Sequence, residues 1–139
     1  MEIMSCTVSD SLQLPLFGAK VSAGFPSPAD DFVEKTLDLN EFLVKHPAAT
    51  FFAKVDGESM TGAGIFPGDY LVVDRSLEAV HGAIVLAAVN GEVTVKRLHK
   101  TERGAELHAA NPAYKPIRIP AGEELQVWGV VTSIIRKVV

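Results

Sequence analysis

The chain has 139 residues, of which 47% are hydrophobic, and this length and composition fit one ordinary folded domain with at most an additional arm. Its formal net charge of -4 excludes a protein that grips nucleic acid through a broad basic surface, because phosphate contacts need clustered lysine and arginine. An acidic partner that binds through a local patch remains compatible with this charge.

The cysteine content and the N-terminal sequence indicate the compartment. The single cysteine, Cys6, cannot form an internal disulfide, which favours a reducing environment. No apolar run is long enough for a membrane span, and the N-terminus lacks the basic start and apolar core of a signal peptide. We therefore expect a cytoplasmic protein.

The N-terminal part of the chain lacks any pattern that predicts regular structure. Residues 1–30 show no sustained hydrophobic period, and three prolines interrupt them. Such a segment is typical of a flexible linker in front of a folded domain. It is also what a cleavable site requires, because a peptidase binds its substrate in an extended form and a helix would hide the bond.

The stretch "DLNEFLVKHP" predicts a short helix after this segment. Asp38 can cap its first turn, and Glu41 follows three residues later, as in a capping box. Pro47 is expected to end the helix. We therefore expect residues 24–48 to form a linker that contains one short helix.

From Thr50 onward, the pattern is one of short strands separated by turn residues. Strands are expected at residues 50–55, 70–74, 83–89, 92–98, 105–110, 116–120 and 125–135. Asn90-Gly91 is the strongest short-range signal for a hairpin in the chain. Short strands in this succession predict a mainly β barrel or sandwich over residues 49–139.

The glycine-rich stretch 55–74 is the densest group of residues with possible chemistry, and it contains Ser59. It lacks the Gly-Lys-Ser/Thr ending of a phosphate loop. It also differs from the nucleophile elbow of an α/β-hydrolase, because a strand rather than a helix is predicted to follow. On this stretch alone, Ser59 is interpreted as a serine in a structural turn.

A serine nucleophile needs a base that takes its proton. The four histidines show neither triad spacing nor metal-ligand spacing, so each is interpreted as a scattered surface or turn residue: His46, His81, His99 and His108. The other kind of base is a lysine that burial keeps neutral, as in Ser-Lys variants of acyl transfer.

Lys96 is the lysine to consider for this role. If Asn90-Gly91 forms a two-residue loop, Val85 pairs with Lys96. Lys96 then shares a strand face with Thr94, while the neighbouring valines point to the opposite face. Periodicity by itself therefore predicts an exposed strand lysine.

Three motifs occur in a fixed order along the chain: "GFPSP" at 24–28, "GESM" at 57–60, and "TVK" at 94–96 after the predicted hairpin. This combination resembles the LexA-like family of self-cleaving serine peptidases, and its UmuD-like members in particular. The resemblance runs from about Phe17 to the C-terminus. It implies a LexA/UmuD-type peptidase fold of short strands and hairpins, with an extended N-terminal arm.

The resemblance also implies roles for individual residues. Ser59 would be the nucleophile, Lys96 the general base, and Ala23-Gly24 the scissile bond, so that residues 1–23 form an arm removed by self-cleavage. Burial must depress the pKa of Lys96 for this reaction to run near neutral pH. The resemblance implies no metal and no cofactor.

The biological role implied by the resemblance is in the SOS response to DNA damage. Contact with RecA filaments on single-stranded DNA would trigger the cut, and the shortened homodimer would join a UmuC-like subunit of an error-prone translesion polymerase. The 23 residues before the predicted cut are too few for the helix-turn-helix domain of a repressor, so direct sequence-specific DNA binding is not expected.

Alternatives remain open at this point. The chain could be a non-catalytic interaction module with the same fold, and a signal-peptidase-like enzyme is disfavoured because no membrane anchor is visible. The route of cleavage is also open. About 26 residues separate Gly24 from Thr50, so the arm can reach Ser59 of its own chain or of a partner subunit.

Overall fold

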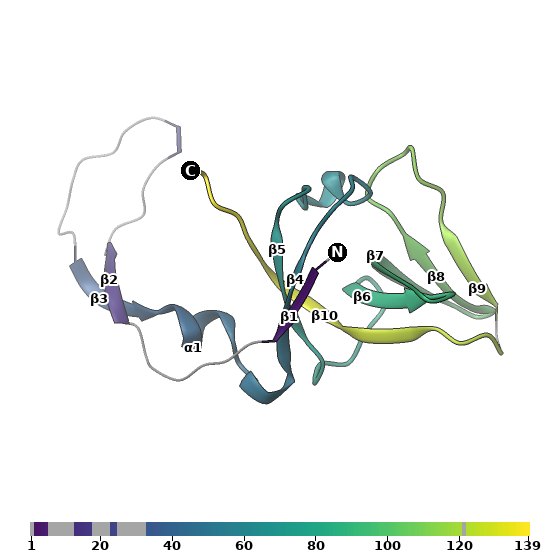
Figure 1. Cartoon of the computed structure of the whole chain (residues 1–139), viewed down its shortest axis with the longest axis horizontal. Coiled ribbons are helices and arrows are strands. Elements are labelled where there is room, and N and C mark those ends of the chain that lie inside the picture. The colour runs from purple at the N-terminus through teal and green to yellow at the C-terminus, as the bar shows by residue number, and fades with distance from the viewer. Residues whose placement is uncertain (1, 6–12, 18–22, 25–32, 121) are drawn as a thin grey trace. The chain divides into compact units, whose positions relative to one another are not determined.

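A computed structural model describes residues 2–5, 13–17, 23–24, 33–120 and 122–139. The chain divides into two compact units, of which the larger comprises Met1–Cys6 and His46–Val139 and the smaller comprises Thr7–Lys45 (Figure 1). None of the helices in the described ranges has the length and hydropathy to cross a membrane.

The larger unit is an eight-stranded antiparallel sheet in the order β1-β4-β5-β10-β6-β7-β8-β9. Its strands are β1 Glu2–Ser5, β4 Thr50–Lys54, β5 Tyr70–Asp74, β6 Ile84–Val89, β7 Glu92–Thr101, β8 Gly104–His108, β9 Ile117–Pro120 and β10 Gln126–Ile135. Two 3₁₀ turns, η1 Pro47–Ala49 and η2 Thr61–Ala63, flank β4. All seven predicted strands of the body are confirmed, and so is the mainly β class.

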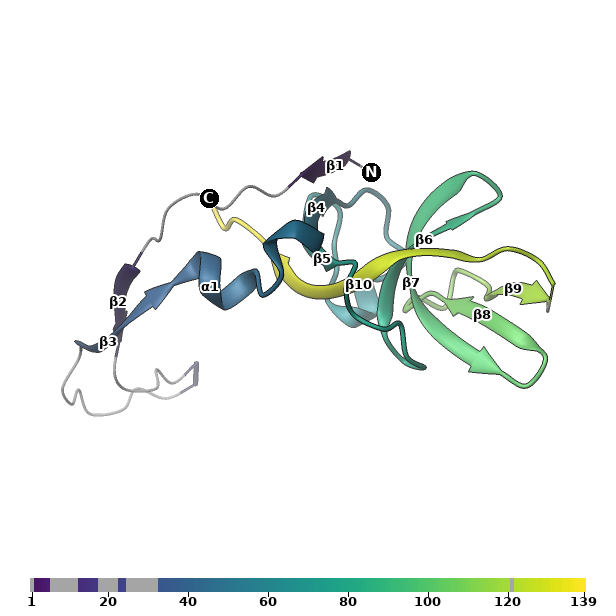
Figure 2. The same cartoon turned by 90° about the horizontal axis from the view of Figure 1, so that it is seen from below.

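Strand β10 lies inside the sheet, between β5 and β6, although it is the last strand of the chain (Figure 2). Its register shifts between Val127 and Gly129, and again between Val131 and Ser133. A Cβ atom at Gly129 would stand 2.6 Å from Val73 Cγ1, so this position needs glycine for β10 to approach β5.

The hairpin between β6 and β7 follows the predicted register. Asn90 and Gly91 have φ values of 50° and 79°, the left-handed geometry of a type I′ turn. Val85 lies opposite Lys96, as expected. This hairpin sets the position of Lys96 in the sheet.

Two hydrophobic clusters cover this part of the sheet, one on each face. Leu86 and Val95 belong to a cluster with residues of β4 and β5, whereas Val85 and Leu98 pack with β8. Adjacent residues of β6 therefore enter different clusters, and neither face of β6 is left to solvent. Lys96, which lies on the paired strand β7, is therefore in a hairpin that is packed on both faces.

The smaller unit contains two strands, β2 Gln13–Phe17 and β3 Val33–Asp38, and the helix α1 Leu39–Leu43. The predicted helix and its cap are confirmed, because Asp38 Oδ1 accepts a hydrogen bond from Asn40 N at 3.0 Å. The helix ends at Leu43, ahead of Pro47, which instead begins η1. The strands β1, β2 and β3 are not predicted by the sequence pattern.

Candidate active site

Ser59 lies in the turn that joins β4 to η2, and this turn is bonded to the segment that follows β8. Ser59 O accepts a hydrogen bond from Ala110 N at 2.8 Å, and Gly62 N donates to Ala110 O at 2.7 Å. Asn111 Nδ2 adds a bond to Glu58 O at 2.9 Å. These bonds fix the backbone on both sides of Ser59.

Gly62 allows this close approach of two backbones. A Cβ atom at this position would lie 2.5 Å from Ala110 O, a distance that real Cβ atoms do not show. Glycine is favoured at position 57 for a different reason, because the φ of Gly57 is 80°, a left-handed conformation that favours glycine. The glycines around Ser59 therefore have the structural use that the sequence indicates.

The amine of Lys96 faces three oxygen atoms. Lys96 Nζ lies 2.9 Å from Ser59 Oγ, 2.6 Å from Thr94 Oγ1 and 3.1 Å from Val95 O. Strand β7 supplies the lysine and the last two of these oxygens, and the glycine-rich turn supplies the serine. The two residues that the sequence proposes as nucleophile and base are thus brought together.

Lys96 is buried, with 8% of its surface exposed, so the exposed strand lysine predicted by periodicity is wrong. Its face assignment is right, because it lies opposite Val85 and on the same side as Thr94. The prediction failed because hydrophobic clusters cover both faces of this hairpin. Alternation of polar and apolar residues along a strand predicts exposure only where one face of the sheet meets solvent.

Burial lowers the pKa of Lys96 below its usual value of 10.5, since the charged amine loses hydration. The three oxygens can satisfy either protonation state. A neutral amine donates to Val95 O and Thr94 Oγ1 and accepts the proton of the Ser59 hydroxyl, whereas an ammonium donates to all three. Proton transfer between Ser59 and Lys96 thus needs no rearrangement of heavy atoms.

Two backbone N–H groups beside the serine are free for a ligand. Within the part of the chain that the structure describes, the N–H groups of Ser59 and Met60 donate to no acceptor. The next amide, Thr61 N, bonds to Glu58 O at 3.4 Å. A negative oxygen close to Ser59 could use the two free donors.

Ala23 and Gly24, the predicted scissile pair, form an exposed bend. They belong to the smaller unit, whereas Ser59 and Lys96 belong to the larger one. Exposure and the lack of a helix or strand at this position suit a peptide bond that a peptidase must bind in an extended form.

The four histidines have more partners than the sequence suggests. His46 Nδ1 lies 2.6 Å from Asp74 Oδ2. The rings of His99 and His108 stack with centroids 3.7 Å apart, and His81 meets His99 edge-on at 5.1 Å. The description of scattered histidines is therefore wrong for His81, His99 and His108, which the paired strands β7 and β8 and the loop before β6 bring together. No three His, Cys, Asp or Glu side chains among the described residues are grouped as metal ligands.

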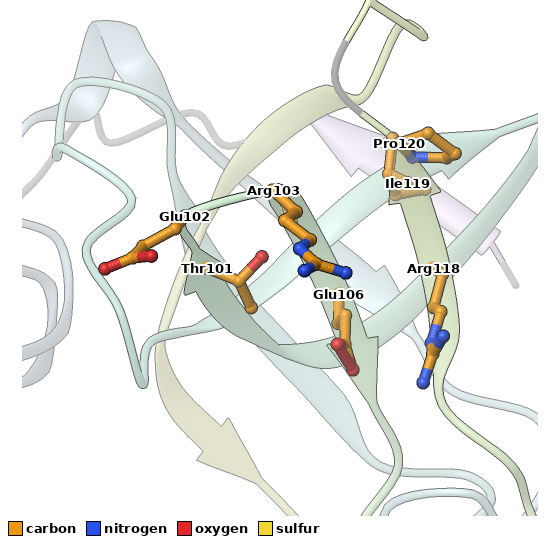
Figure 3. Close-up of a pocket in the computed structure, with 8 residues that line it drawn as sticks. Thr101, Glu102, Arg103, Glu106, Arg118, Ile119 and Pro120 are labelled. Carbon is orange, nitrogen blue, oxygen red and sulfur yellow. The ribbon is translucent and has the colours of Figure 1, made fainter.

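A pocket of about 500 Å³ lies at the β7–β8 turn and β9 (Figure 3). Its charged side chains have both signs: Glu102, Arg103, Glu106 and Arg118. Ser59 and Lys96 do not line it.

Comparison with known proteins agrees with this geometry. A model of the family described as Peptidase S24-like matches residues 15–132. The chain belongs to this family. As a Peptidase S24-like protein it is a serine peptidase of the LexA-like kind, which confirms the predicted enzyme class and fold.

Several curated relatives are similar over most of the chain. Protein SamA of Salmonella typhimurium is 50% identical over 123 residues, which is 88% of this chain and 85% of SamA. Protein MucA of Escherichia coli is 46% identical over 120 residues, covering 86% of this chain and 82% of MucA. The LexA repressor of Alcanivorax borkumensis is 43% identical over 124 residues, or 89% of this chain but only 59% of the repressor.

Proposed function

We propose that this S24-like peptidase cuts its own chain between Ala23 and Gly24, with Ser59 as nucleophile and Lys96 as general base. The observation that carries the proposal is the 2.9 Å contact between Lys96 Nζ and Ser59 Oγ, made by a buried amine whose pKa is lowered. A buried lysine of this kind is the base that a serine without a histidine partner requires.

The reaction follows from the arrangement of these groups. Lys96 Nζ takes the proton of the Ser59 hydroxyl while Ser59 Oγ attacks the carbonyl carbon of Ala23. The N–H groups of Ser59 and Met60 stabilise the oxyanion that forms. Lys96 then gives its proton to the Gly24 nitrogen as the peptide bond breaks, and water releases the acyl group from Ser59 in a second addition step.

The small side chains at the cut fit this chemistry. Ala23 and Gly24 are exposed and offer little bulk, so the carbonyl can approach a serine that is itself only partly exposed. The product would begin at Gly24 and contain 116 residues, which is 139 minus 23. In this account residues 1–23 are the removable arm, 24–48 a linker with a short helix, and 49–139 the peptidase and dimerisation domain.

We further propose an accessory role in SOS mutagenesis for the shortened protein. The support is the identity of 50% to SamA and 46% to MucA over most of the chain, together with the UmuD-like motif order. RecA filaments on single-stranded DNA would trigger the cut in the cytoplasm, and the shortened homodimer would bind a UmuC-like translesion polymerase subunit.

The test is to incubate purified protein at alkaline pH, and separately with RecA filaments, and to determine the intact masses and N-termini of the products. We expect one new N-terminus at Gly24, and no product from the Ser59→Ala and Lys96→Ala variants. Intact protein under both conditions would favour a non-catalytic interaction module with the same fold. A product cut elsewhere would reject the proposed scissile bond.

A further inference from the structure

Strand β1 forms one edge of the eight-stranded sheet, and within the described residues it pairs with β4 alone. In the register, Glu2 lies opposite Lys54, Ile3 opposite Ala53, and Met4 opposite Phe52. These β1 residues belong to the segment 1–23 that the proposed cut would separate from the body. The release of β1 therefore rests on the proposed function, whereas its pairing with β4 does not.

The body does not need β1 for its core. Phe51 and Ala53 of β4 are buried, whereas Ile3 and Met4 of β1 are 41% and 38% exposed. A four-residue strand whose Glu2, Ile3 and Met4 side chains are exposed gives a weak strand pairing by itself. In the uncut chain this pairing is intramolecular and benefits from a high effective concentration, which cleavage removes.

Loss of β1 would uncover a binding edge. The backbone N–H and C=O groups of β4 that face β1 would lose their partners, and such an edge is a template for an added strand. Lys54, which lies opposite Glu2 in the register but forms no ion pair with it, would stand at the end of this edge. The uncovered edge would therefore present free backbone hydrogen-bonding groups along β4 and the positive charge of Lys54 at one end.

A pocket beside Lys54 extends this positive end. It has a volume of about 530 Å³ and is lined in part by Phe66, Tyr70 and Lys137. The charge of Arg136, which also lines it, is matched by Asp69 at 2.6 Å. Neither Lys54 nor Lys137 has a carboxylate within ion-pair distance among the described residues, so the pocket keeps two uncompensated cations next to two aromatic rings.

We propose that β1 occupies the binding site of a partner protein, and that cleavage frees the β4 edge for an extended partner segment with an acidic residue opposite Lys54 and apolar residues after it. The sequence of β1, "EIMS", gives the chemistry of that segment. Main-chain hydrogen bonds would supply affinity, and the contacts at Lys54 and Phe52 would supply specificity.

The first test opens the edge without any cleavage. In a Ser59→Ala chain, Ile3→Pro and Met4→Pro together remove both adjacent N–H groups, one of which faces β4. By hydrogen exchange we expect some amides of residues 51–54 to exchange at least about tenfold faster than in Ser59→Ala alone, while β5 and β7 are unchanged. Equal exchange in the two chains would overturn the proposal.

The second test measures occupancy by a peptide. The probe is a fluorescent peptide with the sequence of residues 1–6, carrying Cys6→Ser, and a matched control peptide carries Glu2→Lys. We expect the probe to bind the open proline variant at least about tenfold more tightly than the Ser59→Ala chain, and the control peptide to bind weakly. Equal affinity of the probe for the proline variant and the Ser59→Ala chain, or equal affinity of the two peptides for the proline variant, would contradict the proposed site.

The cut product, if it forms, should behave like the proline variant in both assays. A product whose β4 amides stay protected through concentration-dependent self-association would overturn the proposal in favour of a second copy of this chain. If the wild-type chain does not cut itself but the proline variant binds the probe, the proposed function fails and the β4 edge site stands.

Discussion

The Lys96 amine lies where burial disfavours its charge although oxygen acceptors surround it. Burial lowers the pKa, while Ser59, Thr94 and Val95 offer three acceptors that suit an ammonium. The net direction is downward, which increases the neutral fraction near physiological pH. The strength of the base thus depends on how many of these acceptors remain.

Thr94 is expected to be a positioning residue for Lys96. In Thr94→Val the Lys96 amine loses its hydrogen bond to Thr94 Oγ1, which is 2.6 Å long. The charged form of the amine is then less stabilised, so the pKa of Lys96 falls further. We expect the maximal cleavage rate to fall roughly tenfold, as one lost hydrogen bond would give, while the pH profile moves to lower pH. Thr94→Ser should restore both. A lower rate with an unmoved profile would indicate a merely structural effect.

Lys96 is also expected to cost stability near neutral pH. Because its folded pKa lies below 10.5, the unfolded chain binds more protons between these two values, and the free energy of unfolding rises with pH in that window. Lys96→Met should therefore stabilise the protein at pH 7 by on the order of 1 kcal/mol and flatten this rise. Denaturant unfolding of both proteins between pH 7 and 10 measures this difference in the free energy of unfolding. A Lys96→Met variant that is less stable than the wild type at pH 7 would refute the destabilising effect of Lys96.

At the scale of elements, the dyad depends on two segments held together at Ala110. In Gly62→Ala the new Cβ meets Ala110 O at 2.5 Å, and the turn that carries Ser59 must move. We expect a loss of about 1 to 3 kcal/mol in stability and a larger proportional loss in cleavage rate. Thr61→Ala, one residue earlier, is the matched control and should change neither. Unaltered cleavage in Gly62→Ala would show that the turn tolerates displacement.

The sequence predicts the body of this fold well, for reasons visible in individual elements. Asn90-Gly91 sets the β6–β7 register by local geometry alone, and Asp38 caps α1 through a neighbouring amide. The exposure of Lys96 depends on long-range packing against both faces of the hairpin, which no local pattern contains. The motif order predicts Ser59 and Lys96 as nucleophile and base. It does not predict that their side chains touch, because that contact depends on the tertiary fold.

At the scale of the whole larger unit, the end of β10 is tied to the loop before β5. Arg136 donates to both oxygens of the buried Asp69 at 2.6 Å and to Gly64 O at 2.7 Å. The hydrogen bond from Arg136 lowers the pKa of Asp69 below 3.8, against an opposing effect of burial. This ion pair joins the C-terminal end of the chain to the glycine-rich segment.

Asp69 is expected to contribute to acid sensitivity. Its folded pKa is lowered, so its stabilisation is complete above the unfolded pKa of about 3.9 and is lost as pH falls through the folded value. Asp69→Asn should lower the free energy of unfolding at pH 7 by on the order of 1 kcal/mol and reduce its fall between pH 5 and 2. An unchanged acid slope in thermal unfolding would disprove this role.

The strands of the N-terminal arm could not be predicted from the sequence, because they are short and depend on distant partners. Strand β1 pairs with β4 nearly fifty residues later, and β2 contains Pro15, a residue that local patterns exclude from strands. Ala23-Gly24 was identified only by resemblance to the family. The arm thus combines the least predictable structure with the segment whose removal the proposed function requires.

The most direct test of the central claim, that a neutral Lys96 activates Ser59, is the pH dependence of the self-cleavage rate followed by intact mass. With burial lowering the pKa of Lys96, we expect the rate of appearance of the Gly24 product to rise above pH 7 and to level off once the amine is deprotonated. A rate that stays flat or falls between pH 7 and 10, in protein that remains folded, would contradict the lysine-base mechanism.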